Sequence, residues 1–224
     1  MKAALAHDWL VEPGGSEEVL REFLSLFPPP APLFVLFWKP DRWRKIIGDR
    51  PVIPSFLQRF PGVHRYYRFL PAWFPRAVES LPIRTGRYDL VFSSSHSAIK
   101  GLIPPQGAVH ICYCYTPMRY VWELEPVYLA RVPPLARGYA RRVFAQLREW
   151  EVRSAPRVTR FIAISRFVAR RIQNYLKRDA QVIYPPADLD FFQPTPHPTR
   201  ESFLVVSRFV PNKGLEEVMQ VASI

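Results

Sequence analysis

Short apolar runs alternate with helical segments along most of the chain, and this alternation restricts the fold more than any other feature. The helical segments repeat their apolar residues every three or four positions, whereas the apolar runs have the short, continuous pattern of buried strands. Predicted strands cover residues 2–10, 33–38, 89–93, 109–115, 159–164 and 181–184, and predicted helices cover 17–27, 135–152 and 166–176. The pattern predicts an α/β fold of the Rossmann-like class, a mostly parallel sheet with helices on both faces.

A further strand, turn and helix pattern stands near the end of the chain. The apolar run Phe203–Val206 precedes a turn that holds Arg208 and Lys213, and a helical pattern starts at Leu215. Two cations near the start of a helix suit a diphosphate group, because each contact is charge-assisted. The alternative is a pair of solvated surface charges.

Prolines separate these two regions of the chain. We expect a first domain at residues 1–184, a proline-rich connector at 185–200 and the first strand–helix unit of a second domain at 201–224. One such unit cannot bury both of its faces alone. The second domain is therefore expected to be incomplete here, and to dock on the first domain or to depend on a partner supplied in trans.

The charge of the chain points to anionic partners. Its 224 residues carry a formal net charge of +12, and the hydrophobic content of 48% is enough for a sizeable core. Such a charge attracts phosphorylated metabolites, anionic membranes or nucleic acid. No motif of a nucleic-acid reader is present, so nucleic acid is not an expected partner. Codon bias toward arginine is the other explanation of the excess.

The two cysteines and the N-terminus bear on the compartment. Cys112 and Cys114 are one residue apart, which suits neither a redox pair nor a zinc knuckle, so buried free thiols on one face of a strand are expected. His7 and Asp8 interrupt the first apolar run, which argues against a secretory signal. A cytoplasmic protein is predicted, and association with a membrane surface stays open.

Gly14 and Gly15 separate the first predicted strand from the first predicted helix. Glycines in such a turn let the backbone approach a ligand, and a helix N-terminus favours anions. Ser16 is the expected N-cap of this helix, and Ser165 is the expected N-cap of the helix predicted at 166–176. A tight turn without a ligand explains the two glycines equally well, since the three-glycine dinucleotide pattern is missing.

Two polar residues at strand ends are candidates for chemistry. His96 lies in a serine-rich loop after a strand, where it is either structural or catalytic, and Asp8 is a candidate base. No Ser-His-Asp order, paired-histidine metal motif or P-loop stands out, and no metal site is predicted.

Aromatic residues and arginines interleave between Phe56 and Arg76. Proline-broken short helices are expected there. The segment has three interpretations: it buries its aromatics and exposes its arginines, it docks on an anionic membrane, or it stacks on single-stranded nucleic acid.

Five stretches of the chain together resemble the family 4 glycosyltransferases, which have the two-domain GT-B fold. The likeness is greatest to the bacterial mannosyltransferase-like branch, which works in surface polysaccharide and lipid-linked glycan assembly. The stretches follow the family's order over almost the whole chain: 6–10 with 14–17, 94–101, 112–122, 161–165 with 182–186, and 206–214.

The resemblance implies a hexosyltransferase. It would move a sugar from a UDP- or GDP-linked donor to a glycan or lipid-linked acceptor, with retention at the anomeric carbon and without a metal or other cofactor. In such enzymes the first domain mainly presents the acceptor, and the second binds most of the donor. Arg208 and Lys213 match the pair that holds the donor diphosphate, and Gly14 and Gly15 match the loop that faces the cleft.

Four residues acquire candidate roles from the resemblance. Tyr115 stands where this branch usually has a histidine on the donor-sugar side of the site, so it is a candidate catalytic residue. Asp8, Arg119 and Ser165 lie in the matching stretches and are candidates for the acceptor side or the cleft.

The family's paired-glutamate motif and nucleoside pocket would lie beyond residue 224. We therefore expect little or no transferase activity from this chain alone. The alternative function is non-enzymatic: a basic α/β module that docks on an anionic membrane or a partner protein.

Overall fold

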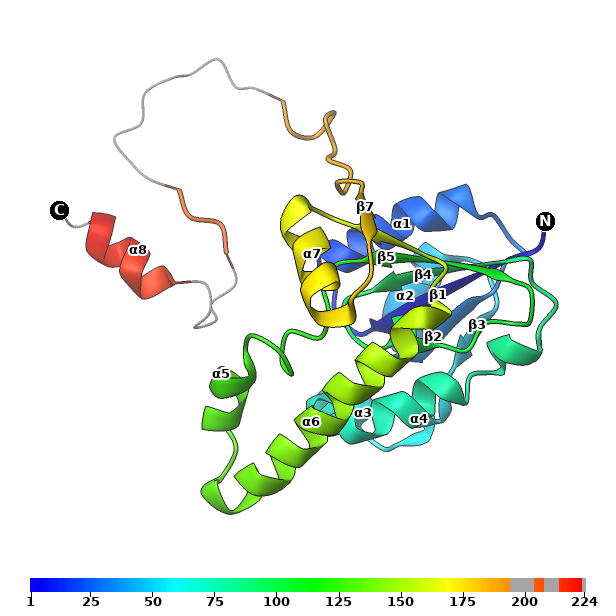
Figure 1. Cartoon of the computed structure of the whole chain (residues 1–224). Helices are drawn as coiled ribbons and strands as arrows, with labels where there is room; N and C mark the ends of the chain where they lie inside the picture. Colours follow the sequence, from blue (N-terminus) through cyan, green and yellow to red (C-terminus); the bar gives the residue numbers. More distant parts are fainter. Residues whose placement is uncertain (194–203, 208–213, 223–224) are drawn as a thin grey trace. The chain divides into compact units, whose positions relative to one another are not determined.

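The computed structural model describes residues 1–193, 204–207 and 214–222, and the chain divides into two compact units, Met1–Pro186 and Ala187–Ile224. The first unit contains a seven-stranded sheet, and the second contains the described helix α8 (Leu215–Ala222) (Figure 1). Among the described residues, no helix combines the length and apolar character needed to cross a membrane.

Every strand pairing in the sheet is parallel. The strand order is β3-β2-β1-β4-β5-β6-β7. The strands are β1 (Ala3–Leu10), β2 (Leu33–Trp38), β3 (Val52–Pro54), β4 (Leu90–Ser95), β5 (Val109–Cys114), β6 (Arg160–Ala163) and β7 (Ala180–Val182). This arrangement confirms the predicted Rossmann-like α/β class.

Helices cover both faces of this sheet. α1 (Gly15–Leu26) and α2 (Pro40–Ile47) pack on the face that includes Leu5, whereas the opposite face includes Ala4 and Ala6. On that opposite face lie α3 (Val63–Tyr66), α4 (Phe74–Glu79), α6 (Arg137–Ser154) and α7 (Arg166–Arg171), and α5 (Glu125–Ala130) precedes α6 (Figure 1). The division follows from the strand geometry, since successive side chains point to opposite faces.

The strand order reverses beside β1. β2 follows β1 on one side, and β4 pairs with β1 on the other, with His7 opposite Ser94. The connections that leave β1 and β4 therefore run to opposite faces of the sheet, which opens a crevice outside the carboxyl ends of these two strands. Parallel α/β proteins bind their ligands at this position.

Several local predictions are confirmed by the structure. Cys112 and Cys114 are buried free thiols on one face of β5, packed against α7. The Ser165 hydroxyl accepts a hydrogen bond from the backbone N–H of Val168, 3.2 Å away, and so caps α7. The segment from Phe56 to Arg76 forms a series of short helical turns, as expected.

Other predictions were wrong in detail. The N-cap of α1 is Gly14 rather than Ser16, whose hydroxyl instead donates to the Glu17 carboxylate at 2.8 Å. Leu135 and Tyr139 share the apolar spacing of the helix predicted at 135–152, yet they are 102% and 69% exposed. Leu135 lies in a short turn before α6, and the first turns of α6 extend beyond the sheet (Figure 1). α2 and β3 were not predicted.

The second unit matches its prediction in part. Residues 204–207 form no strand, although the apolar run predicted one; a strand needs a paired neighbour, and none lies among the described residues of this unit. The helix α8 is confirmed. Arg208 and Lys213 lie outside the described residues, so their assignment stays a prediction.

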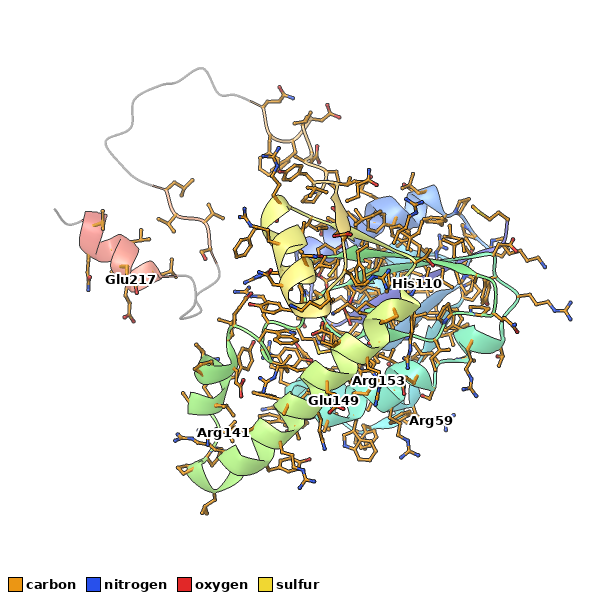
Figure 2. The ribbon with its side chains drawn as sticks, viewed as in Figure 1. Arg59, His110, Arg141, Glu149, Arg153 and Glu217 are labelled. Atoms are coloured by element: carbon orange, nitrogen blue, oxygen red, sulfur yellow. The ribbon has the colours of Figure 1, made fainter. Side chains whose placement is uncertain are left out.

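His110 in β5 gives the fold a predicted pH dependence. Its ring is buried among the side chains of the sheet, 2.8 Å from the Ser93 hydroxyl and 3.1 Å from the Arg157 carbonyl (Figure 2). Burial lowers the pKa of His110 to about 4, whereas an imidazole in an unfolded chain titrates near about 6.5. Between these values the unfolded state binds a proton that the folded state does not, so the free energy of unfolding falls as the pH is lowered through this window.

Urea unfolding at a series of pH values measures this effect. The slope of unfolding free energy against pH should be clearly positive between about pH 4 and 6.5, and His110→Gln should flatten it. An unchanged slope in that variant would contradict the assignment to His110.

Candidate functional site

The Asp8 carboxylate organises the loop that follows β4. It is fully buried and accepts backbone N–H groups from His96 at 2.7 Å, Ser97 at 2.8 Å and Ile99 at 2.7 Å. Although burial by itself raises the pKa of Asp8, nearby His96 and Lys100 and the Ile99 N–H lower it below its ordinary value. A carboxylate engaged in this way positions the loop, and it is poorly placed to remove a proton from an acceptor.

His96 follows β4 at the edge of the sheet where the strand order reverses, and its side chain is 23% exposed. The edge of its ring meets the Trp9 ring at a centroid distance of 4.6 Å, and its Nδ1 is 3.6 Å from the Asp8 carboxylate. Nδ1 has no hydrogen-bond partner among the described residues. Burial lowers the pKa of His96, so the ring is neutral near pH 7.

A closed ring of polar contacts holds the diglycine loop against the sheet. The Tyr115 hydroxyl donates to the Ser16 carbonyl at 2.9 Å and lies 3.0 Å from the Ser94 hydroxyl. The Ser94 hydroxyl lies 3.2 Å from Nδ1 of His7, whose Nε2 lies 3.6 Å from the Glu17 carboxylate. The ring closes because the Ser16 hydroxyl donates to Glu17 at 2.8 Å. These five residues are called the polar ring below.

Gly14 and Gly15 differ in their need for glycine. Gly14 has an extended backbone with φ of −160°, and a Cβ there would lie 2.9 Å from the Glu17 carboxylate. A Cβ on Gly15 would meet nothing within 4 Å. The close approach of the Glu17 carboxylate therefore explains why position 14 is a glycine. Neither Gly14 nor Gly15 has the left-handed backbone conformation that favours glycine.

Tyr115 has the geometry of a positioning residue. Burial raises the pKa of its phenol well above the ordinary value, so the group stays neutral over the physiological range. Its single proton is used by the Ser16 carbonyl. A neutral, hydrogen-bonded phenol can fix the first turn of α1 but cannot act as a base at neutral pH.

Tyr115→Phe tests that role. Removing the hydroxyl takes this donor from the Ser16 carbonyl and leaves the Ser94 hydroxyl with His7 alone, which should lower the free energy of unfolding by about 1–2 kcal/mol. Hydrogen exchange of the Ser16 and Glu17 amides should become faster. The matched control Tyr139→Phe, in a side chain that is 69% exposed, should change neither quantity, and equal effects in the two variants would count against the polar ring.

Arg119 and Ser165 lie at the same edge of the sheet but outside the polar ring. Arg119 follows β5, the neighbour of β4, and Ser165 follows β6, which lies one strand further out. The Ser165 hydroxyl is used as the cap of α7. The Arg119 side chain is exposed. Within the described part of the chain, no hydrogen bond joins either side chain to the polar ring, so their roles stay predictions.

Sequence reasoning did not select His7, Ser94, Glu17 and Trp9 as site residues. Each lies within two positions of a residue that was selected, but its side-chain direction depends on strand register and on the first turn of α1. The strict alternation of side chains along β1 could have shown only that His7 and Asp8 point to opposite faces.

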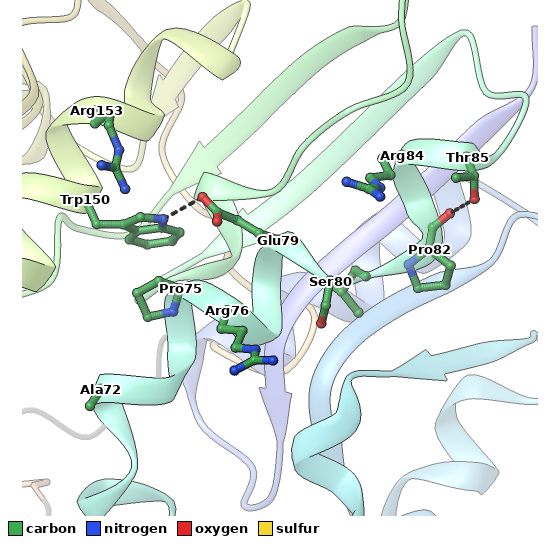
Figure 3. A pocket seen from close by; sticks show the side chains of 11 residues that line it. Ala72, Pro75, Arg76, Glu79, Ser80, Pro82, Arg84, Thr85, Trp150 and Arg153 are labelled. Atoms are coloured by element: carbon green, nitrogen blue, oxygen red, sulfur yellow. Dashed lines mark hydrogen bonds between the residues drawn. The ribbon is translucent and has the colours of Figure 1, made fainter.

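A hollow of about 710 Å³ lies elsewhere on the first unit, and none of the predicted site residues lines it. Three arginines surround it, Arg76, Arg84 and Arg153 (Figure 3). Glu79 on its wall is already engaged, since it accepts the Trp150 indole N–H at 2.8 Å and pairs with Arg157 at 2.8 Å. The hollow is thus basic and separate from the polar ring.

One solved structure with a TM-score above 0.5 supports the Rossmann-like fold of this chain. The Anabaena protein Alr3699/HepE, solved in complex with UDP, matches 99% of this chain and 50% of its own, with 14% identity and a TM-score of 0.51. A second structure of that protein, with UDP and glucose, has 15% identity and a TM-score of 0.44 over 88% of this chain and 47% of its own. A glycotransferase of kitacinnamycin has 12% identity and a TM-score of 0.33 over 72% and 45%. This chain therefore spans about half the length of these proteins.

The family of this chain is assigned from a family model, because sequence identities of 12–15% to solved structures show the fold alone. No curated protein matches the chain. The model described as Glycosyltransferase Family 4, however, matches residues 14–191, which is more than half of the sequence and includes the diglycine loop, His96 and Tyr115. The Rossmann-like sheet agrees with the GT-B fold of such proteins. The chain belongs to glycosyltransferase family 4.

Proposed function

We propose that the chain is the acceptor-side half of a glycosyltransferase. The complete enzyme would transfer a hexose from a UDP- or GDP-linked donor to a glycan or lipid-linked acceptor, with retention and without a metal ion in the transfer step. The observation that carries the proposal is the polar ring at the strand-order reversal, which fixes the N-terminus of α1 at the crevice beside His96. A bacterial mannosyltransferase-like role in polysaccharide assembly is the finer form of the proposal.

The donor nucleotide would meet the chain at the first turn of α1. Unpaired backbone N–H groups at a helix N-terminus favour phosphate oxygens, and Gly14 carries no side chain to block them. UDP is the first nucleotide to test because Alr3699/HepE was solved with it. Arg208 and Lys213 remain the proposed diphosphate pair of the second unit, and a complete donor domain could act in trans.

Equilibrium binding and turnover test this proposal. The purified chain should bind UDP- or GDP-sugars weakly, and Gly14→Val should weaken binding at least tenfold, because its side chain would displace the Glu17 carboxylate. Gly138→Ala in α6, where a Cβ meets nothing within 4 Å, is the control. Absence of binding to any nucleotide sugar would contradict the proposal. We expect no measurable transfer by the chain alone, and robust turnover would overturn that expectation.

A membrane-docking role is favoured by a separate observation. In the aromatic–arginine tract, Phe74 is buried, but Phe69 is 80% exposed and Trp73 is 43% exposed. Arg59 and Arg68 are exposed beside them, and neither pairs with a described carboxylate. Exposed aromatics flanked by free arginines suit a bilayer that contains anionic lipids.

Sedimentation with liposomes tests this role. The chain should bind vesicles that contain anionic lipid more strongly than neutral vesicles, and Phe69→Ser should weaken binding. Leu26→Ser is the matched control, because Leu26 is 69% exposed on α1, on the other face of the sheet. An absence of binding to both kinds of vesicle would contradict the membrane-docking role.

A further inference from the structure

Three arginines without protein partners surround the basic hollow of the first unit. Arg76 belongs to α4, Arg153 to α6, and Arg84 to the short turn Pro82–Thr85 (Figure 3). Among the described residues, none of their guanidinium groups forms a hydrogen bond or an ion pair. Positive charges from three separate elements repel one another around this concave surface, where the field of like charges is focused. An anion in the hollow would offset this repulsion.

Trp150 gives the hollow a rigid aromatic wall. Its indole N–H donates to Glu79 at 2.8 Å, and a Cβ at position 101 would lie 2.4 Å from its ring, so the ring packs directly against Gly101. Because this wall is fixed before a ligand arrives, it loses little conformational entropy on binding.

The charge of the three arginines is not cancelled from within the hollow. Glu79 is the one acidic side chain among the described residues that line it, and this carboxylate already pairs with Arg157 at 2.8 Å. The Ser80 and Thr85 hydroxyls donate to backbone carbonyls, at 3.0 Å and 2.9 Å, so their protons are used. The free donors that line the hollow are therefore the arginine N–H groups.

We propose that the basic hollow binds a terminal phosphate group. A guanidinium presents its N–H donors in a planar fork that matches phosphate oxygens, so arginine suits phosphate better than a point charge does. A terminal phosphate has three free oxygens and a charge of about −1.5 to −2 at pH 7. Three arginines from three elements can meet such a group from several sides.

The basic hollow is distinct from the crevice proposed for the donor. The segments that bear Arg84 and Arg153 lead into the amino ends of β4 and β6, whereas the polar ring lies at the carboxyl ends of β1 and β4. Nucleotide sugars carry no terminal phosphate, so UDP-glucose should bind in the hollow more weakly than pyrophosphate. The inference therefore does not depend on sugar transfer.

Two sources supply a terminal phosphate: a dissolved phosphorylated compound and a lipid headgroup. Inorganic pyrophosphate is the probe for the first source. Phosphatidylcholine vesicles that contain phosphatidic acid are the probe for the second. Vesicles with phosphatidylglycerol at a matched surface charge are the reference, because the phosphate of that lipid is a diester.

Titration of the full chain with pyrophosphate, followed by NMR, tests the inference. The Arg84 amide and the Trp150 indole should show saturable shifts, and Gly14 should not. Arg84→Gln and Arg153→Gln should each weaken pyrophosphate binding by about fivefold or more. Both side chains are exposed and without protein partners, so both variants should fold, which circular dichroism checks.

Two matched controls separate this site from general attraction to a basic protein. Arg87→Gln lies three positions after Arg84, and Arg142→Gln lies in α6 like Arg153; both arginines are exposed, and neither lines the hollow. Each control removes one positive charge, as each site variant does. Both should bind pyrophosphate like the original chain, and equal losses in control and site variants would overturn the proposal.

The vesicle arm identifies the source and separates this inference from the membrane-docking role. Preference for phosphatidic acid over phosphatidylglycerol, lost in the two site variants, would assign the hollow to a lipid headgroup. Pyrophosphate binding without that preference would assign it to a dissolved compound. Failure of both probes would overturn the proposal. If the site variants still bound both kinds of anionic vesicle, membrane docking through Phe69 would stand without the phosphate site.

Discussion

Lys100→Met is expected to lower the free energy of unfolding by about 3–5 kcal/mol, because it leaves a carboxylate buried without its cation. The Lys100 ammonium lies 2.7 Å from the Glu151 carboxylate, and the two side chains are 3% and 1% exposed. It also donates to the Ser97 carbonyl. Although burial by itself lowers the pKa of Lys100, Glu151 raises it above the ordinary value, so the ammonium group is charged at neutral pH.

Partial rescue distinguishes this pair from simple loss of packing. Glu151 also accepts the Met118 N–H at 3.0 Å and the Trp122 indole at 2.7 Å. Lys100→Met combined with Glu151→Gln removes the unpaired charge but retains an acceptor, so the double variant should be at least about 1 kcal/mol more stable than Lys100→Met alone. Lys45→Met on the exposed side of α2 is the control and should change stability by less than about 0.5 kcal/mol. Urea unfolding measures all three, and a cost below about 1 kcal/mol for Lys100→Met would contradict the account.

Asp8→Ala is expected to cost at least about 3 kcal/mol. The substitution leaves the backbone N–H groups of His96, Ser97 and Ile99 without their acceptor, and each unsatisfied buried donor costs about 1–3 kcal/mol. Asp8→Asn should also be destabilising, since its NH₂ group would face donors. The loop after β4 should lose protection from hydrogen exchange in both variants.

The pH dependence of unfolding gives a second test at Asp8. A carboxyl whose folded pKa is lowered stabilises the protein above its unfolded pKa, and this contribution is lost as the pH falls through the lower folded pKa. Asp8→Asn should remove this part of the acid sensitivity, whereas Asp49→Ala, an exposed control on the same unit, should retain it. Retained hydrogen-exchange protection of Ser97 and Ile99 in Asp8→Ala would show that the loop does not depend on Asp8.

The parts of the fold that could be predicted are those set by local periodicity. Residues 33–38 were expected as a strand and form β2, and Ser165 was expected to cap α7 and does so. β3 was missed because Val52–Pro54 is short, follows Pro51 and itself ends in a proline. A proline is tolerated in β3 because this strand lies at the edge of the sheet.

The polar ring could not be predicted, because it joins residues that only strand register brings together. Ser94 stands opposite His7 across the β1–β4 pairing, and Tyr115 lies 99 positions from Ser16. Three residues that the sequence selected, Gly14, His96 and Tyr115, lie at this edge of the sheet. It could not show that Asp8 and Tyr115 use their polar atoms to hold loops, because that depends on hydrogen-bond partners distant in sequence.

The location of nucleotide-sugar binding on the labelled chain tests the central claim most directly. Amide chemical shifts of the ¹⁵N-labelled protein, followed by NMR during titration with UDP-glucose and GDP-mannose, report that location. The account predicts saturable shifts at Gly14, Gly15 and His96, around the carboxyl ends of β1 and β4. Saturable shifts confined to the basic hollow around Arg76 and Arg84, with none in the diglycine loop, would contradict it.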